Sequence, residues 1–130
     1  MRKALLGTLC ALALAASTPR VEAATANFQG ACSWSGSDLN CVFDALRPSG
    51  SGSACPGSSI ANVSWDFGDG SNPIVTTSTF ISHTYSPPQD AAYQVQLSIS
   101  CADQTTADAW RGLCVSIGFA NCIYIGQGWN

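Results

Sequence analysis

Apolar and polar residues alternate most regularly between Tyr93 and Cys101. Every second residue of this segment is apolar, and the residues between them are glutamine or serine. Successive side chains of a β-strand point to opposite faces of its sheet, so this period predicts a strand with one buried and one solvated face. A shift of one residue would bury every polar side chain, so the pattern also specifies the pairing register.

Five further segments carry weaker forms of the same pattern, and turn-forming residues separate them. These predicted strands are residues 27–34, 39–45, 60–67, 74–85 and 106–117. A loop rich in Gly, Ser and Pro occupies residues 47–59, and an Asp-Gly pair at Asp69-Gly70 follows one strand, which is a hairpin signal. Short strands with regularly spaced turns predict an all-β protein of the β-sandwich class.

Residues 1–23 have the layout of a secretory signal peptide. Arg2 and Lys3 precede an apolar run at residues 4–16, and the following segment contains Pro19 and ends in Val-Glu-Ala. Small residues at the last and third-last of these positions suit cleavage after Ala23. The apolar run is shorter than the roughly 20 residues of a membrane-spanning helix. We therefore predict a secreted or periplasmic protein whose mature form has no membrane span.

The chain after residue 23 has few charges and few strong helix formers. It contains no Lys, Glu or Met, which are among the best helix formers. Its cations are Arg47 and Arg111, which face seven aspartates, so its net charge is −5. Two cations cannot form the basic patch that binding to nucleic acid requires, and we therefore exclude nucleic acid as a partner.

Six cysteines follow residue 23, and this even number predicts three disulfides in an oxidising compartment. Two of them share the core-facing parity of consecutive predicted strands, one ends a strand within reach of the long loop, and one points outward, toward the tail. These positions predict the pairs Cys32–Cys41, Cys55–Cys101 and Cys114–Cys122, although the spacing alone leaves 15 pairings open. The short Cys-x₂₋₄-Cys spacing of zinc sites does not occur, so zinc is not expected.

Three motifs occur in the order Trp65-Asp66-Phe67-Gly68-Asp69-Gly70, His83-Thr84-Tyr85 and Tyr93-Gln94-Val95-Gln96-Leu97. They resemble the signature of the PKD (polycystic kidney disease) domain. The resemblance covers residues 25–118 and leaves residues 119–130 as an added aromatic tail. It departs from the family at Ala92, where glycine is frequent, and in the length of the 47–59 loop. It implies an immunoglobulin-like β-sandwich with a non-catalytic role in protein–protein or protein–carbohydrate contact.

The titratable residues of these motifs have both chemical and structural interpretations. Asp66 and Asp69 could form a carboxylate pair or bind calcium. Aspartate beside glycine also stabilises turns by bonding its own backbone, and we favour this second reading. The resemblance still allows one calcium ion, because some members of the family bind calcium. His83 lacks a recognisable nucleophile motif, and the resemblance assigns it to packing. We therefore predict no catalytic residue and no enzymatic activity.

Four aromatic residues are not explained by the predicted core, namely Trp34, Trp110, Tyr124 and Trp129. Aromatic rings on a lightly charged surface are typical of sites that stack on sugars or contact proteins. A second interpretation is that the tail folds back and buries these rings in a small separate core. The sequence thus predicts an extracellular module that binds a carbohydrate polymer or a matrix protein. The alternative is an exported structural or inhibitory protein that binds another protein.

Overall fold

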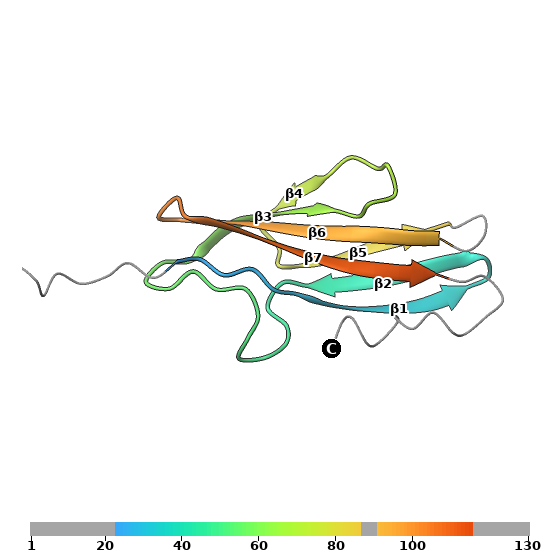
Figure 1. The fold of residues 1–130 in the computed structure, drawn as a ribbon, viewed down its shortest axis with the longest axis horizontal. Coiled ribbons are helices and arrows are strands. Elements are labelled where there is room, and N and C mark those ends of the chain that lie inside the picture. Colours follow the sequence, from blue (N-terminus) through green and yellow to red (C-terminus); the bar gives the residue numbers. More distant parts are fainter. Residues whose placement is uncertain (1–22, 87–90, 116–130) are drawn as a thin grey trace, which may run out of the picture.

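The computed structural model describes residues 23–86 and 91–115, which form two antiparallel β-sheets packed face to face (Figure 1). The predicted signal peptide up to residue 22 and the predicted tail, with Cys122, Tyr124 and Trp129, lie outside the described residues. The strands are β1 (Gln29–Ser35), β2 (Asp38–Asp44), β3 (Ile60–Asp66), β4 (Ile74–Thr76), β5 (Phe80–Tyr85), β6 (Ala91–Cys101) and β7 (Thr106–Val115).

One sheet has the strand order β1-β2-β5 and the other has the order β4-β3-β6-β7. The prediction of an all-β sandwich is therefore confirmed, and the alternation from Tyr93 onward forms the centre of β6. Within residues 23–86 and 91–115 there is no helix of the length and apolar character that crossing a membrane requires.

The segment 74–85 is not the single strand that its sequence predicts. β4 pairs with β3 in the four-stranded sheet, whereas β5 pairs with β2 in the three-stranded sheet. Between them, the amide of Ser78 donates to Oγ1 of Thr76, and the hydroxyl of Ser78 donates to the carbonyl of Phe80. These local bonds compete with the sheet ladder and accompany the crossing of the chain between sheets. The prediction that this segment is extended is confirmed, but the prediction that it forms one continuous strand is wrong.

The core lies between the two sheets and is rich in aromatic rings. Trp65 of β3 is fully buried, and its ring centroid lies 5.2 Å from that of Phe28 and 5.8 Å from that of Phe43. β6 adds Val95, Leu97 and Ile99, which are also fully buried. Large rings supply much of the apolar area that a domain of this size buries. The inward parity predicted for β2, β3 and β6 is thus the observed one.

Two disulfides join Cys32 to Cys41 and Cys55 to Cys101. Both pairs are those predicted from strand parity. Cys114 is also disulfide-bonded, and Cys122, its predicted partner, lies outside the described residues. The first bridge links directly paired residues of β1 and β2. The second closes a separation of 46 residues and attaches the long loop to the end of β6.

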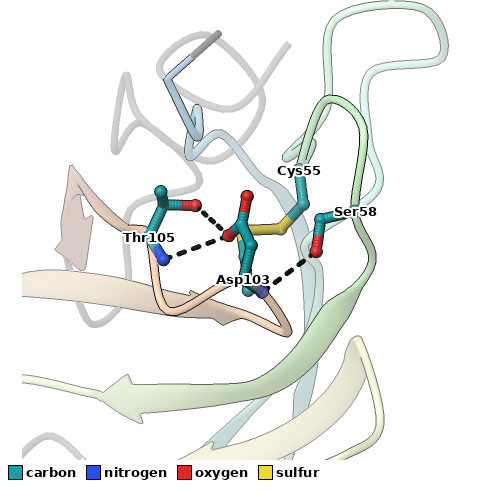
Figure 2. The surroundings of a disulfide bond; sticks show 5 residues. Cys55, Ser58, Asp103 and Thr105 are labelled. Carbon is teal, nitrogen blue, oxygen red and sulfur yellow. Dashed lines mark hydrogen bonds between the residues drawn. A yellow bond between two sulfur atoms is a disulfide. The ribbon is translucent and has the colours of Figure 1, made fainter. Parts of the chain in front are cut away.

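The turn between β6 and β7 lies beside the Cys55–Cys101 bridge (Figure 2). The amide of Asp103 donates to Oγ of Ser58, so the turn is bonded to the long loop. The Asp103 carboxylate accepts from both the amide and the hydroxyl of Thr105. These bonds hold the pKa of Asp103 below its ordinary value. The disulfide and the hydrogen bonds together close this end of the sandwich.

The segment before β1 is hydrogen-bonded both to the long loop and to β7. Ser53, the one buried polar residue among those that the structure describes, accepts from the amide of Asn27 and donates to its carbonyl. Arg111 of β7 donates to the Asn27 side chain and to the Phe28 carbonyl. Arg111 shares the inward parity of Leu113, so one of the two arginines in the described part of the chain serves the fold itself.

Candidate binding face on the four-stranded sheet

The Asp-Gly turn after β3 is built as its sequence predicts. Oδ1 of Asp66 accepts from the amide of Gly68, and Oδ1 of Asp69 accepts from the amide of Ser71. Gly68 and Gly70 have φ angles of 74° and 85°, which L side chains rarely adopt. At Gly68 a Cβ atom would also overlap the backbone of Gln94 in β6. The two aspartates therefore stabilise a turn that presses closely on the neighbouring strand.

Two residues of β5 connect this turn to the other sheet. The Nε2–H of His83 donates to Oδ2 of Asp69 at 2.6 Å, and the hydroxyl of Tyr85 donates to the carbonyl of Phe67 at 2.9 Å. The His83 ring also stacks on Phe67, with centroids 3.9 Å apart and planes 8° from parallel. The motifs of the sequence are therefore contact partners across the sandwich.

These contacts set the protonation behaviour of the motif. Burial opposes ionisation of Asp69, but hydrogen bonds from Ser71 and His83 outweigh it and hold the pKa of this carboxyl below its ordinary value. Burial, together with the nearby Asp69 carboxylate, raises the pKa of the Tyr85 phenol. The same two causes raise the pKa of Tyr93. The aspartate is thus held as an anion and the tyrosines as neutral phenols, which suits a structural role.

The described residues hold no cluster of three or more His, Cys, Asp or Glu side chains arranged to bind a metal ion. The calcium ion that the resemblance allowed is a proposal without a described site. Both Oδ1 atoms of Asp66 and Asp69 are engaged by amides of their own turn.

Trp110 lies on the outward face of the four-stranded sheet and is 53% exposed. Its pairing partner is Gln96 of β6, which in turn pairs with Asp66 of β3. Paired residues of an antiparallel sheet point to the same side, so these three side chains form one row across three strands. The neighbouring residues on the same side are Gln94, Ser98 and Asp108. We call these six residues the Trp110 face.

The Trp110 face combines one exposed indole ring with amide, hydroxyl and carboxylate groups. Gly112, the next residue of β7 on this side, has no side chain, and no described atom lies within 4 Å of the place where a Cβ would be. The two arginines of the described chain are elsewhere: Arg111 points inward and Arg47 follows β2. Charge on the face comes from Asp66 and Asp108 alone. Such a surface can stack on the apolar side of a sugar ring and exchange hydrogen bonds with its hydroxyls.

The other predicted aromatic residues do not join this face. Trp34 belongs to β1, has inward parity and is 40% exposed because it lies near the strand end. Tyr124 and Trp129 lie outside the described residues. Gln94, Gln96 and Ser98 were read from the sequence only as the solvated side of a strand. The signal that could have singled them out was the outward parity of Trp110 on the strand next to them.

Comparison with known proteins identifies the family to which this fold belongs. Residues 31–110 match the family model of the PKD domain. The chain belongs to the PKD domain family. No curated protein sequence matches it significantly.

One solved structure similar to this PKD domain comes from work on the promiscuous specificity of carbohydrate-binding modules from the β-sandwich superfamily. That structure has 26% sequence identity and a TM-score of 0.61, over 75% of this chain and 36% of the other chain. The PKD1 domain of the Vibrio cholerae metalloprotease PrtV has 19% identity and a TM-score of 0.48, over 73% of this chain and 99% of that domain. The PKD1 domain of Vibrio anguillarum Epp has 18% identity and a TM-score of 0.49, over 75% and 98% of the two chains.

Proposed function

We propose that this PKD domain is a non-catalytic extracellular module that binds a carbohydrate polymer on the Trp110 face. The observation that carries the proposal is the half-exposed Trp110 indole in one row with Gln96 and Asp66. An exposed tryptophan leaves a large apolar ring in contact with water, which is unfavourable. A ligand that stacks on the ring would cover this surface. The similarity to a structure of carbohydrate-binding modules supports the same class of ligand.

The negative charge of the Trp110 face limits the class of polymer that can bind there. Its carboxylates, Asp66 and Asp108, have no arginine or lysine beside them on this face. Anionic polysaccharides would be repelled, so we expect a neutral polymer such as cellulose or chitin. A matrix protein such as collagen is the other ligand class that an aromatic face of this kind accommodates.

Export is part of the proposal. Two disulfides join described residues, and such bridges persist in oxidising compartments. Residues 1–23 would direct export out of the cytoplasm, either to the exterior or to a periplasm, and would then be removed. Mass spectrometry of the exported protein should find an amino terminus at Ala24, and an intact Met1 would contradict this part of the proposal.

Sedimentation with insoluble polymers tests the function. The protein is mixed with cellulose, chitin, peptidoglycan and collagen, and the bound fraction is compared between the wild type and Trp110→Ala. We expect binding to one carbohydrate polymer that weakens at least about tenfold in Trp110→Ala, a change of about 1.4 kcal/mol. Trp34→Ala removes an indole of similar exposure from the other sheet and should leave binding unchanged. Binding to no polymer, or equal binding by Trp110→Ala, would contradict the proposal.

A protein partner is the second candidate, and β4 favours it. This strand of three residues is an edge of the four-stranded sheet, and its Ile74 and Val75 side chains are exposed. An exposed apolar edge is a surface on which another protein can add a strand. In that case Val75→Lys, and not Trp110→Ala, would abolish the interaction.

A further inference from the structure

A pocket lies on the side of the sandwich opposite the Trp110 face, on the outward face of the three-stranded sheet. It has a volume of about 250 Å³ and includes the side chains of Gln29, Ala31, Val42, Asp44, Arg47 and Phe80. We call it the Phe80 pocket. Gln29, Asp44 and Phe80 form one row, because Asp44 pairs with Gln29 of β1 and with Phe80 of β5. Phe43, the neighbour of Asp44, is fully buried, so the row points outward.

The Phe80 pocket has an apolar part and a polar part. Phe80 is 53% exposed although it belongs to a strand, and Val42 beside it is also exposed. The polar part is the Asp44 carboxylate and the Arg47 guanidinium. A turn after β2, in which the Arg47 amide donates to the Asp44 carbonyl, returns Arg47 to the side of Asp44. An aromatic ring next to a donor and an acceptor is a combination that recognises one face and one edge of a sugar ring.

The Asp44 carboxylate is oriented by a hydrogen bond, and the Arg47 guanidinium beside it is exposed to solvent. Oδ1 of Asp44 accepts from the amide of Leu46 at 2.9 Å, which orients the carboxylate. Its Oδ2 lies 3.8 Å from Nε of Arg47, which is longer than a hydrogen bond. Two neighbouring hydroxyls of a ligand could therefore bond there, one donating to Oδ2 and the other accepting from the guanidinium. The opposite charges cancel locally, which suits a neutral ligand.

We propose that the Phe80 pocket is a second saccharide site, which holds one neutral sugar ring with its apolar side on Phe80 and two adjacent hydroxyls on Asp44 and Arg47. Its volume is below the roughly 300–1,000 Å³ of pockets for larger ligands, so it takes a single ring and not an extended chain. The Phe80 pocket and the Trp110 face belong to different sheets and point in opposite directions. Together with the proposed function, on which this consequence rests, the domain would hold a polymer chain on the Trp110 face and a single ring of a second saccharide, such as a chain end, in the Phe80 pocket.

Nuclear magnetic resonance titration of the purified protein tests both sites separately. Cellohexaose, chitohexaose and xylohexaose are the probes, each added alone. The indole N–H of Trp110 reports on the Trp110 face, and the Nε–H of Arg47 with the amides of Ala31 and Val42 reports on the Phe80 pocket. We expect saturable shifts of the Phe80 pocket signals with at least one probe. In Phe80→Ala this binding should weaken at least about tenfold, while the response of Trp110 stays the same.

The control is Leu46→Ala, which truncates a half-exposed apolar side chain next to Arg47 that does not line the pocket. It should leave both sets of signals as in the wild type. A shift of Trp110 alone would support the proposed function and overturn the second site. A shift of the Phe80 pocket signals alone, lost in Phe80→Ala, would support the second site and contradict binding on the Trp110 face. No shift at either site, or pocket shifts that persist in Phe80→Ala, would overturn the second site.

Discussion

The imidazole of His83, in the three-stranded sheet, and the carboxylate of Asp69, in the loop that joins two strands of the four-stranded sheet, meet at 2.6 Å. His83 comes from β5, and Asp69 comes from the turn that follows β3. Both side chains are largely enclosed, with 16% and 19% of their surfaces exposed. The pair therefore links the two layers at one point, beside the stacked rings of His83 and Phe67.

Asp69→Asn should change the acid stability of the domain. The pKa of Asp69 is lower in the folded protein than its ordinary value of 3.8, so the unfolded chain takes up the proton first as the pH falls. The stabilisation is fully present well above pH 3.8 and is lost as the pH falls through the folded pKa. The variant should lose about 1–2 kcal/mol near pH 6 and show a shallower fall in stability below pH 4. Urea unfolding from pH 2 to 6 measures both effects.

The control for this experiment is Asp108→Asn, which replaces an exposed aspartate of β7. It should follow the wild-type profile. An Asp69→Asn profile parallel to that of the wild type would mean that the carboxylate does not couple protonation to folding.

Gly68 and Gly70 form a matched pair for the turn after β3. Both have positive φ, so alanine at either position should cost about 1–2 kcal/mol in backbone strain. Only at Gly68 would the new Cβ overlap the backbone of Gln94, whereas the space around Gly70 is open. Gly68→Ala should therefore cost a further 1–3 kcal/mol, roughly the cost of forced overpacking. Equal unfolding free energies for the two variants would show that the turn can move away from β6.

The two described disulfides should differ in their contribution to stability. They close separations of 46 and 9 residues, and a longer loop loses more entropy when it is cross-linked in the unfolded chain. Replacing both cysteines by alanine should cost about 4 kcal/mol for Cys55–Cys101 and about 2.5 kcal/mol for Cys32–Cys41. Chemical denaturation of the two double variants gives this order, and a larger loss for the shorter loop would contradict it.

Substitutions at Gly112 test whether the ligand binds on the Trp110 face. Gly112 of β7 pairs with Gln94 of β6, its φ is not positive, and no described atom lies within 4 Å of the place where its Cβ would be. Gly112→Ala should raise the unfolding free energy by about 0.5–1 kcal/mol and leave polymer binding unchanged. Gly112→Ile should also fold, but its branched side chain would stand beside the indole and weaken binding about tenfold. Unchanged sedimentation of Gly112→Ile would place the ligand elsewhere.

Strand positions and buried faces were predictable because they depend on local alternation. The inward parity of Trp65, Val95 and Leu97, and two of the disulfide pairs, follow from period-2 patterns within single strands. The break near Ser78 was not predictable in this way. Both β4 and β5 are extended, and nothing local distinguishes a strand that continues in one sheet from two strands that belong to different sheets.

By itself, the sequence determined the fold class, the core-facing side of most strands and the outward direction of Trp110. Only the tertiary structure decided what lies next to each outward residue. The row of Asp66, Gln96 and Trp110 and the row of Gln29, Asp44 and Phe80 each combine three strands. Their registers are set where two sheets bury their inner faces together, and that condition involves residues far apart along the chain. Both candidate sites are made by that long-range pairing.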